Sequence, residues 1–335
     1  MLPENIKKIL KNQHYEIVGK HEHSAVQICR WTKKSLREEG VCYKEKFYGI
    51  KSHLCCQMTP AVMWCPNKCI HCWRAIELTL GDKLPEKEID SPTEIIDGCI
   101  KAQRRLLQGF KVDKNSKKKQ LSKANMKKYS ESQEPMQFAI SLSGEPTTYK
   151  FLGGIIEELR KRGKTSFLVT NGLYPEKIKE LISKNQLPTQ LYVSVNSPNK
   201  ELYSRFHRSS IKDAWEKLDE TLKLMNKING KTRTVFRMNL VKELNMLPEH
   251  AKEYAELIKK ANPLFVEIKG FMSVGFARER LGYEKMPTNR EMEDFIKVVI
   301  KELGKEWKLL NKHEFSRAYV LGKDKKELKI KKNQI

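Results

Sequence analysis

The chain has 335 residues, of which 39% are hydrophobic and 32% charged, so it can bury a sizeable core in one large domain or two smaller ones. Its 65 Lys and Arg residues against 41 Asp and Glu residues give a net charge of +24, which favours a polyanionic partner such as nucleic acid. No apolar run reaches transmembrane length and the N-terminus lacks the apolar segment of a signal peptide, so we expect a cytoplasmic protein without disulfides.

The first cysteines of the chain are evenly spaced. Cys29, Cys42 and Cys55 follow a short amphipathic helical pattern within residues 1–28, and each lies thirteen positions after the one before. This spacing is too wide for a single loop knuckle. It suits three ligands that successive segments deliver to one point. Cys56 and Cys99 have no such partners and are interpreted as small buried hydrophobic residues.

From residue 49 onward, apolar strands alternate with amphipathic helices. The predicted helices span about 92–109, 150–162, 175–185, 212–228 and 248–260. The predicted strands are Ile50–Met58, Met136–Ser143, Thr165–Thr170, Gln190–Val195, Thr234–Val241 and Leu264–Met272. Strand and helix repeated about six times predict an α/β fold with a parallel sheet and right-handed crossovers. Because a closed barrel has eight such units, six favour an open, partial (β/α)6 barrel.

Two segments interrupt this alternation. Residues 111–129 carry eight lysines and a single acid, which indicates either a flexible surface insertion or an arm that contacts phosphates. The tail at 323–332 is similarly basic, and residues 314–321 before it are expected to add an edge strand. We therefore predict an N-terminal extension over 1–48, the partial barrel over 49–305 and a C-terminal extension over 306–335.

A second group of cysteines follows the first predicted strand. Cys65, Cys69 and Cys72 form a CxxxCxxC pattern at the carboxyl end of that strand, where parallel-sheet enzymes place their active sites. Thiolates select zinc or iron–sulfur clusters, and a structural zinc site has four closed ligands. Three cysteines can instead hold three irons of a 4Fe–4S cube and leave one iron open for a chelating ligand. The spacing favours the cluster, with a zinc knuckle completed by His71 or a remote cysteine, or reduced core thiols, as alternatives.

Small polar clusters follow the next strands, at residues 143–147, 170–172 and 194–198. Glycine and asparagine form turns in many contexts, so each cluster alone is a weak signal. Their recurrence at equivalent positions in successive strand–helix units indicates ligand contacts at one edge of the sheet.

The cysteine pattern, Gly144-Glu145-Pro146 and Thr170-Asn171-Gly172 together resemble the radical S-adenosylmethionine enzymes. In that superfamily, the open iron of the cube is chelated by the amino and carboxylate groups of S-adenosylmethionine. The resemblance implies that the cluster ligands are Cys65, Cys69 and Cys72, that the methionyl amino group meets Gly144 and Glu145, and that the ribose meets Asn171 and Ser194.

A closer resemblance, to the tRNA wyosine-base (4-demethylwyosine) synthases, covers nearly the whole chain. It rests on the evenly spaced N-terminal cysteines, on residues 63–74, and on residues 141–146 and 193–196. It implies that Cys29, Cys42 and Cys55 hold a second 4Fe–4S cluster and that Lys44 forms an imine with pyruvate. The chain resembles the archaeal form, without a flavodoxin domain, so we expect a monomer that receives electrons from an external ferredoxin or flavodoxin.

The reaction implied by this family starts with cleavage of S-adenosylmethionine to methionine and a 5′-deoxyadenosyl radical. The radical removes hydrogen from the methyl group of 1-methylguanosine, beside the anticodon of tRNA-Phe. The resulting carbon radical adds to pyruvate, held on Lys44 or on the second cluster. Loss of the carboxyl-derived carbon and ring closure then give the tricyclic base.

The excess of positive charge suits a tRNA substrate, whose target base must leave its stack to react. Trp31, Trp73, Arg74 and residues 205–208 are candidates for base stacking, although packing or solvated charge is an equally ordinary role for them. Other classes remain open: a different two-cluster radical RNA modifier, such as a methylthiotransferase, or a basic RNA-binding protein with structural metal sites.

Overall fold

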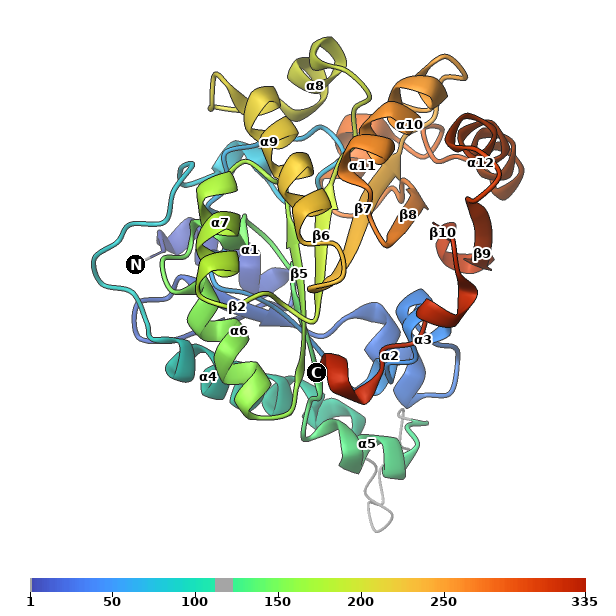
Figure 1. Ribbon diagram of the computed structural model, residues 1–335. Helices are drawn as coiled ribbons and strands as arrows, with labels where there is room; N and C mark the ends of the chain where they lie inside the picture. The colour runs from blue at the N-terminus through green and yellow to red at the C-terminus, as the bar shows by residue number, and fades with distance from the viewer. Residues whose placement is uncertain (1, 112–122) are drawn as a thin grey trace. The chain divides into compact units, whose positions relative to one another are not determined.

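The computed structural model describes residues 2–111 and 123–335 (Figure 1). The chain divides into two compact units. The N-terminal unit comprises Met1–Val62, Leu84–Leu168 and Lys329–Ile335, and the C-terminal unit comprises Met63–Lys83 and Val169–Leu328. Most of the predicted basic insertion, residues 112–122, lies outside the described residues. The three-part division expected from the sequence stays a prediction.

Among the described residues, five strands belong wholly or partly to the N-terminal unit. Antiparallel pairing joins β1 (Glu16–Val18) to β2 (Ser24–Gln27) and β2 to β3 (Cys55–Thr59). Parallel pairing joins β3 to β4 (Gln137–Ile140) and β4 to the start of β5 (Thr165–Thr170). The strands β3, β4 and β5 are the first three of the predicted parallel series. Most of their residues are buried, as expected for a sheet covered on both faces.

Six helices of this unit alternate with its strands: α1 (Glu4–Asn12), α2 (Arg30–Leu36), α3 (Tyr43–Tyr48), α4 (Pro92–Leu107), α5 (Met126–Ser132) and α6 (Leu152–Lys161), counted over the described residues. The predicted start of α4 is confirmed. Ser91 and Glu94 form a capping box around Pro92 at the first helical position. The predicted end of α6 is also confirmed, because Gly163 has a φ of +64°, a left-handed conformation that glycine adopts without steric cost.

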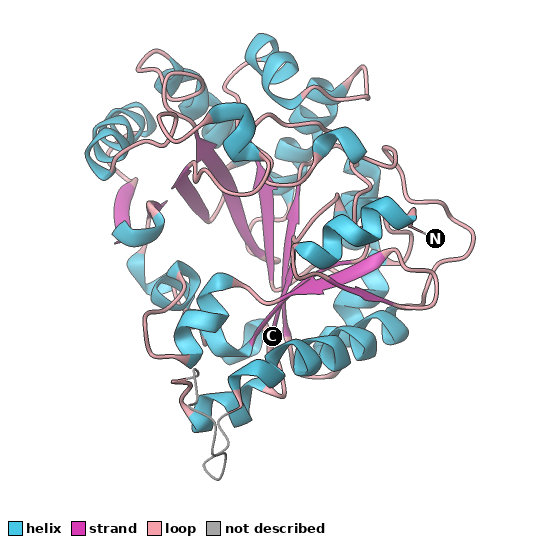
Figure 2. Ribbon diagram, turned by 180° about the vertical axis from the view of Figure 1, so that it is seen from behind, coloured by secondary structure: helices cyan, strands magenta, loops and turns pink. Residues whose placement is uncertain are grey.

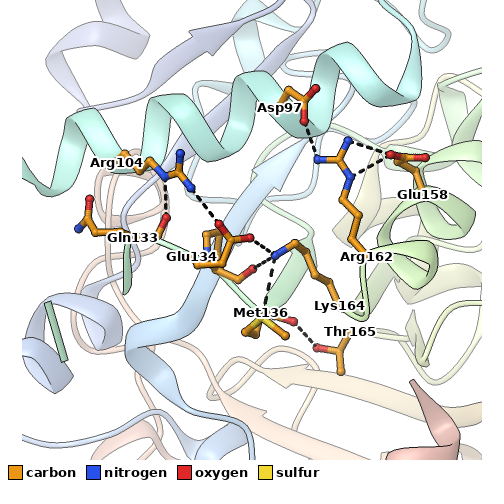
Figure 3. A network of polar contacts seen from close by, with 10 residues as sticks. Asp97, Arg104, Gln133, Glu134, Met136, Glu158, Arg162, Lys164 and Thr165 are labelled. Carbon is orange, nitrogen blue, oxygen red and sulfur yellow. Dashed lines mark hydrogen bonds and ion pairs between the residues drawn. The ribbon is translucent and has the colours of Figure 1, made fainter. Parts of the chain in front are cut away.

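A polar network fixes how α4 and α6 meet the strands that follow (Figure 3). Arg162 at the end of α6 donates to Asp97 at 2.5 Å and to Glu158 at 2.9 Å. The buried Lys164 donates to the Pro135 carbonyl at 2.7 Å and is ion-paired with Glu134. Since Lys164 lies directly before β5, these bonds set where that strand begins.

The C-terminal unit repeats the same alternation, shown with helices in cyan and strands in magenta in Figure 2. Parallel pairing joins β6 (Gln190–Ser194), β7 (Arg233–Leu240) and β8 (Phe265–Gly270), and antiparallel pairing joins β8 to β10 (Ala318–Gly322) and β10 to β9 (Lys308–His313). Its helices are α7 (Pro175–Ser183), α8 (Lys200–His207), α9 (Ala214–Lys227), α10 (His250–Ala261), α11 (Ala277–Leu281) and α12 (Asn289–Leu303).

The α/β class and the open partial barrel are confirmed. At the two ends of the parallel series, β3 pairs with the antiparallel β2, and β8 pairs with the antiparallel β10. Both end strands therefore have their second edge occupied by a strand outside the series, and the described strands do not close into a barrel. The helices of the C-terminal unit pack on one another in sequence, α7 on α9, α9 on α10 and α10 on α12.

Two boundary predictions are wrong. Residues 52–54 form a 3-10 turn instead of the start of a strand, because Glu45 accepts hydrogen bonds from both the backbone N–H (2.7 Å) and the hydroxyl (2.6 Å) of Ser52. The expected edge strand over 314–321 is shorter and is not at an edge. Residues 314–316 form a turn that ends at Arg317, in a left-handed conformation, and β10 then lies between β8 and β9.

None of the helices within residues 2–111 and 123–335 combines the length and the apolar character needed to cross a membrane.

Candidate functional site

The loop that carries Cys65, Cys69 and Cys72, here called the cysteine loop (residues 63–73), belongs to the C-terminal unit. Its start is held in place because the Cys65 N–H donates to the Gly81 carbonyl at 2.8 Å. Its end forms a turn in which the Cys72 N–H donates to the Cys69 carbonyl at 3.0 Å. The three thiols are half-buried, so they are sheltered by the loop while remaining open to a ligand.

The three thiols lie close enough to influence one another. Burial raises the pKa of the Cys69 thiol well above its usual value, and the charges of Cys72 and Cys65 raise it further. Arg74 opposes this effect. A bound metal would relieve this effect on Cys69, because it deprotonates its sulfur ligands and neutralises their charge.

The cysteine loop is fixed to the end of helix α8 by backbone hydrogen bonds. The Lys68 N–H donates to the His207 carbonyl at 2.9 Å, and the Ile70 N–H donates to the Phe206 carbonyl at 3.1 Å. One side chain adds to these bonds, because the Nδ1 atom of His207 lies 3.1 Å from the Cys69 Sγ. The end of α8 therefore sets the position of the middle cysteine.

Arg74 stabilises the loop from inside the fold. Its side chain is 4% exposed and donates to the Asn67 carbonyl at 2.6 Å and to the Thr79 hydroxyl at 2.7 Å. Burial alone lowers the pKa of Arg74, but the charges of the three loop cysteines outweigh it and the pKa is raised. The predicted role of Arg74 in base stacking is wrong, because a buried guanidinium held in this way cannot reach RNA.

Helix α11 closes over the far end of the loop. Arg280 donates to the Ile70 carbonyl at 3.1 Å and also bonds to the Cys72 carbonyl. Before α11, Gly275 has a φ of +56°, and a Cβ there would lie 2.4 Å from the Trp73 carbonyl oxygen. Only glycine allows the chain to approach the loop this closely.

The residues predicted to contact the ribose are both at strand ends of the C-terminal unit. Asn171 follows β5, and its Nδ2 lies 4.0 Å from the Cys65 Sγ while its Oδ1 accepts from the Leu173 N–H at 3.0 Å. Ser194 is the last residue of β6 and is half-buried opposite Arg237 of β7. The structure places Asn171 beside the cysteine loop, and the ribose contacts stay predictions.

The residues predicted to contact the methionyl amino group lie in the N-terminal unit, after β4. Glu145 is 3% exposed, and its Oε1 accepts from the Thr147 hydroxyl at 2.6 Å and from the Thr147 N–H at 3.2 Å. Gly144 precedes it in the same turn and is half-buried. The carboxylate is thus oriented by its own turn, and the role of both residues in binding S-adenosylmethionine stays a prediction.

The evenly spaced cysteines, here called the N-terminal triad (Cys29, Cys42 and Cys55), are gathered in the N-terminal unit. Cys29 precedes α2, Cys42 precedes α3 and Cys55 begins β3. Thr32 of α2 donates to the Ser52 carbonyl at 3.0 Å, and the Cys42 N–H donates to the Ser52 hydroxyl at 2.8 Å, so one turn joins the three segments. Burial raises the pKa of Cys55, and so do the charges of Cys29 and Cys42.

Lys44 lies in the first turn of α3, two residues after Cys42. It is 8% exposed, although this chain carries 65 basic residues and most of its lysines face solvent. Its Nζ lies 5.0 Å from the centre of the Phe167 ring, and its charge lowers the pKa of Cys55. The structure therefore places a buried amine among the thiols of the N-terminal triad.

Neither group of thiols forms a site for a single metal ion among the described residues. Within residues 2–111 and 123–335, no three His, Cys, Asp or Glu side chains converge closely enough to share one metal ion. A cube differs from an ion because each of its cysteines binds a different iron, so its thiols surround a larger object. Three thiols beside a buried cation, Arg74 in one unit and Lys44 in the other, fit such a cluster.

The zinc alternative has no support from His71. The ring of His71 stacks on Phe206 at 4.8 Å and its Nε2 lies 3.5 Å from the Asn196 Nδ2, and among the described residues it does not converge with two cysteines on one metal position. The two remaining cysteines, Cys56 and Cys99, are fully buried as predicted, and all eight cysteines are free.

The other residues proposed to meet RNA differ in exposure. Trp31 and Trp73 are half-buried, while Arg205 and Arg208 are exposed. Phe206 and His207 are 1% and 2% exposed, and they hold the cysteine loop instead. Sequence reasoning missed this second role of α8, because nothing in a basic cluster indicates which of its members face inward.

Comparison with known families divides the chain into two matched segments. Residues 61–258 match the model of the Radical SAM superfamily. Residues 260–323 match the model described as wyosine base formation.

Curated relatives match over almost the whole chain. The S-adenosyl-L-methionine-dependent tRNA 4-demethylwyosine synthase of Pyrococcus abyssi is 45% identical over 324 residues, which are 96% of this chain and 90% of that protein. The enzyme of the same name from Methanocaldococcus jannaschii is 33% identical over 334 residues, covering 99% of this chain and 100% of that one.

Solved structures agree with these matches. A structure described as TYW1 with a lysine-pyruvate adduct bound superposes with a TM-score of 0.82 at 33% identity, covering 99% of both chains. A crystal structure of archaeal TYW1 superposes with a TM-score of 0.74 at 30% identity, covering 96% of this chain and 97% of that one.

Proposed function

The chain belongs to the family of S-adenosyl-L-methionine-dependent tRNA 4-demethylwyosine synthases, and from this premise we propose that it joins 1-methylguanosine in tRNA-Phe to pyruvate. The family resemblance predicted from the cysteine spacing is thereby confirmed. A radical-generating enzyme of this kind uses S-adenosylmethionine and a 4Fe–4S cluster, and it acts on tRNA. The identity of the second substrate, the second cluster and the external electron donor are parts of the proposal.

The cysteine loop is the proposed site of the cluster. Cys65, Cys69 and Cys72 would each hold one iron, leaving the fourth iron for S-adenosylmethionine. When bound, the cluster and S-adenosylmethionine supply a 5′-deoxyadenosyl radical that can remove hydrogen from a methyl group. The loop's own contribution is position and charge, because α8 fixes its backbone and Arg74 places a buried positive charge beside the three sulfurs.

The observation that carries the proposal for pyruvate is the buried Lys44. A lysine amine attacks a ketone to form an imine with release of water, and it does so best where it is desolvated or beside other charges that shift its protonation. Lys44 is 8% exposed, against the ring of Phe167 and among the thiols of the N-terminal triad. Burial also excludes water and so slows hydrolysis of the imine, which would keep pyruvate bound until the radical forms on the tRNA. The lysine-pyruvate adduct in the description of the solved relative supports this assignment.

The N-terminal triad is proposed to hold the second cluster. Three segments converge on the turn at Ser52, and burial together with the charges of Cys29 and Cys42 raises the pKa of Cys55, which a bound cluster would relieve. Its role would be to orient pyruvate beside Lys44. The large positive charge of the chain, +24, would attract and hold the tRNA through its phosphates.

The direct test is a product assay under anaerobic, reducing conditions. The full chain is incubated with S-adenosylmethionine, pyruvate and tRNA that carries 1-methylguanosine, and the digested nucleosides are analysed by mass spectrometry. We expect 4-demethylwyosine together with 5′-deoxyadenosine. S-adenosylmethionine cleavage without the tricyclic base, in the presence of both substrates, would contradict the proposal.

A second test isolates the role of Lys44. Reduction with borohydride in the presence of labelled pyruvate should attach the label to Lys44 and should fail in a Lys44→Arg variant. Lys164→Arg is the matched control, since Lys164 is also buried in the N-terminal unit but is paired with Glu134 and the Pro135 carbonyl. Equal labelling of both variants would remove Lys44 from the mechanism.

A further inference from the structure

We propose that His207 is a positioning residue that donates a hydrogen bond to the thiolate of Cys69 and so sets the reduction potential of the cluster in the cysteine loop. The inference rests on the proposed function only in placing the cluster on this loop. It assigns a task to a residue in a segment where the sequence indicated RNA contact.

The geometry of the contact is well defined. The Nδ1 atom of His207 lies 3.1 Å from the Cys69 Sγ, within the range of a hydrogen bond to sulfur, and the side chain is 2% exposed. The imidazole stacks on Tyr203 at 4.4 Å and meets the edge of Phe206 at 5.4 Å. Because rings pack on it, the imidazole cannot turn away from the sulfur without disturbing α8.

The contact of His207 with the Cys69 thiol is shorter than the contact of Asn171 with the Cys65 thiol. Asn171 approaches Cys65 only to 4.0 Å. The backbone also helps to fix the position of Cys69, because the His207 carbonyl accepts a hydrogen bond from the Lys68 N–H at 2.9 Å. One residue thus holds both the peptide before Cys69 and its sulfur.

The direction of the hydrogen bond follows from the chemistry of the sulfur. An iron-bound thiolate has no proton, so it can only accept, and the proton must be on Nδ1 of the imidazole. The other nitrogen, Nε2, is buried without a hydrogen-bond partner among the described residues. Burying an unpaired nitrogen lone pair costs less free energy than burying an unpaired N–H group. Both nitrogens therefore favour the tautomer with the proton on Nδ1.

A hydrogen bond to a cluster sulfur changes the energy of electron uptake. Reduction adds negative charge to the cluster and its thiolates, and an N–H dipole aimed at one sulfur stabilises the reduced state more than the oxidised one. Hydrogen bonds to the sulfurs are one of the factors that set the potentials of iron–sulfur clusters. His207 should therefore make the cluster easier to reduce by an external donor.

The test measures the midpoint potential in the full chain, using the electron paramagnetic resonance signal that changes when S-adenosylmethionine is added. His207→Phe keeps an aromatic ring against Tyr203 but removes the donor, and His207→Asn keeps an N–H near the position of Nδ1. Tyr203→Phe is the matched control, since it alters the same helix and keeps the stacked ring. Iron content and thermal stability are measured for every variant.

We expect His207→Phe to shift the midpoint potential to a more negative value at unchanged iron content, while His207→Asn and Tyr203→Phe stay near the wild type. An unchanged potential in a fully loaded His207→Phe protein would overturn the inference. If His207→Phe fails to load iron, His207→Asn decides: normal loading and potential support the hydrogen bond, and equal loss of iron overturns it. A wild-type chain without the S-adenosylmethionine-sensitive signal would overturn the proposed function, and this inference with it.

Discussion

The substitution Arg74→Leu tests whether the cysteine loop is built around a buried cation. Arg74 makes two hydrogen bonds as a charged donor, to the Asn67 carbonyl at 2.6 Å and to the Thr79 hydroxyl at 2.7 Å. Hydrogen bonds to charged groups contribute about 1.5–3 kcal/mol each, and a buried acceptor left without a partner adds to the loss. Leucine fills part of the volume but donates nothing. The free energy of unfolding should therefore fall by about 3–6 kcal/mol.

Urea unfolding of the metal-free protein, followed by circular dichroism, measures this loss as a lower midpoint concentration. Hydrogen exchange in residues 63–83 would locate it, since the loop should lose protection before the rest of its unit. The control is Arg205→Leu, the same change at an exposed arginine that is ion-paired with Glu201 at 3.3 Å, where we expect a loss of less than about 1 kcal/mol. Equal midpoints for the two variants, or weaker tRNA binding with unchanged stability for Arg74→Leu, would refute the reasoning.

Replacing all three cysteines of the N-terminal triad by alanine should reduce the iron content from about eight to about four per chain, measured after anaerobic reconstitution. The Lys329 ammonium donates to the Lys46 carbonyl near the end of α3, the six-residue helix that carries Lys44. Lys329→Met removes this bond and should slow pyruvate trapping at Lys44 by about two- to fivefold, with Lys332→Met as the control. Burial lowers the pKa of His23, so the unfolded chain binds a proton first as the pH falls. The free energy of unfolding should then decrease by up to about 1.4 kcal/mol per pH unit below about pH 6.5, and less steeply in a His23→Gln variant.

The parallel strands and their helices could be predicted because the spacing of hydrophobic residues in the sequence indicates which residues are buried. The predicted strand Thr165–Thr170 has the same bounds in the structure, because its apolar centre Phe167–Val169 is flanked by the β-branched Thr165 and Thr170 and followed by the turn residues Asn171 and Gly172. The short strands β1 and β2 have only three and four residues, too few for a period of two to stand out. The position of β10 between two partners could not be predicted either, because strand order is a property of tertiary pairing.

Prediction of the candidate site from the sequence is limited in the same way, because the direction in which a side chain points depends on tertiary packing. The cysteine positions and Lys44 could be proposed from spacing and family resemblance, and their roles as cluster ligands and as the imine-forming amine stay predictions. The roles of Arg74 and His207 could not be predicted from the sequence. A basic residue next to an aromatic one gives the same sequence pattern whether its side chain faces solvent or the interior. Helix α8 exposes Arg205 and buries the two residues after it, a difference that depends on the loop packed against the helix.

This distinction between buried and exposed cations predicts how tRNA binding depends on salt. Each phosphate contact made by an exposed lysine or arginine contributes about 0.7–0.9 to the slope of log affinity against log salt concentration. Lys44 is buried beside thiols that become anionic when they bind metal, so its charge is neutralised locally and releases no counterion from RNA. Lys44→Met should therefore leave the salt slope of tRNA binding unchanged while abolishing pyruvate trapping. A shallower slope in that variant would place Lys44 on the RNA-binding surface, and the excess charge of +24 would then have to include the lysine assigned to the imine.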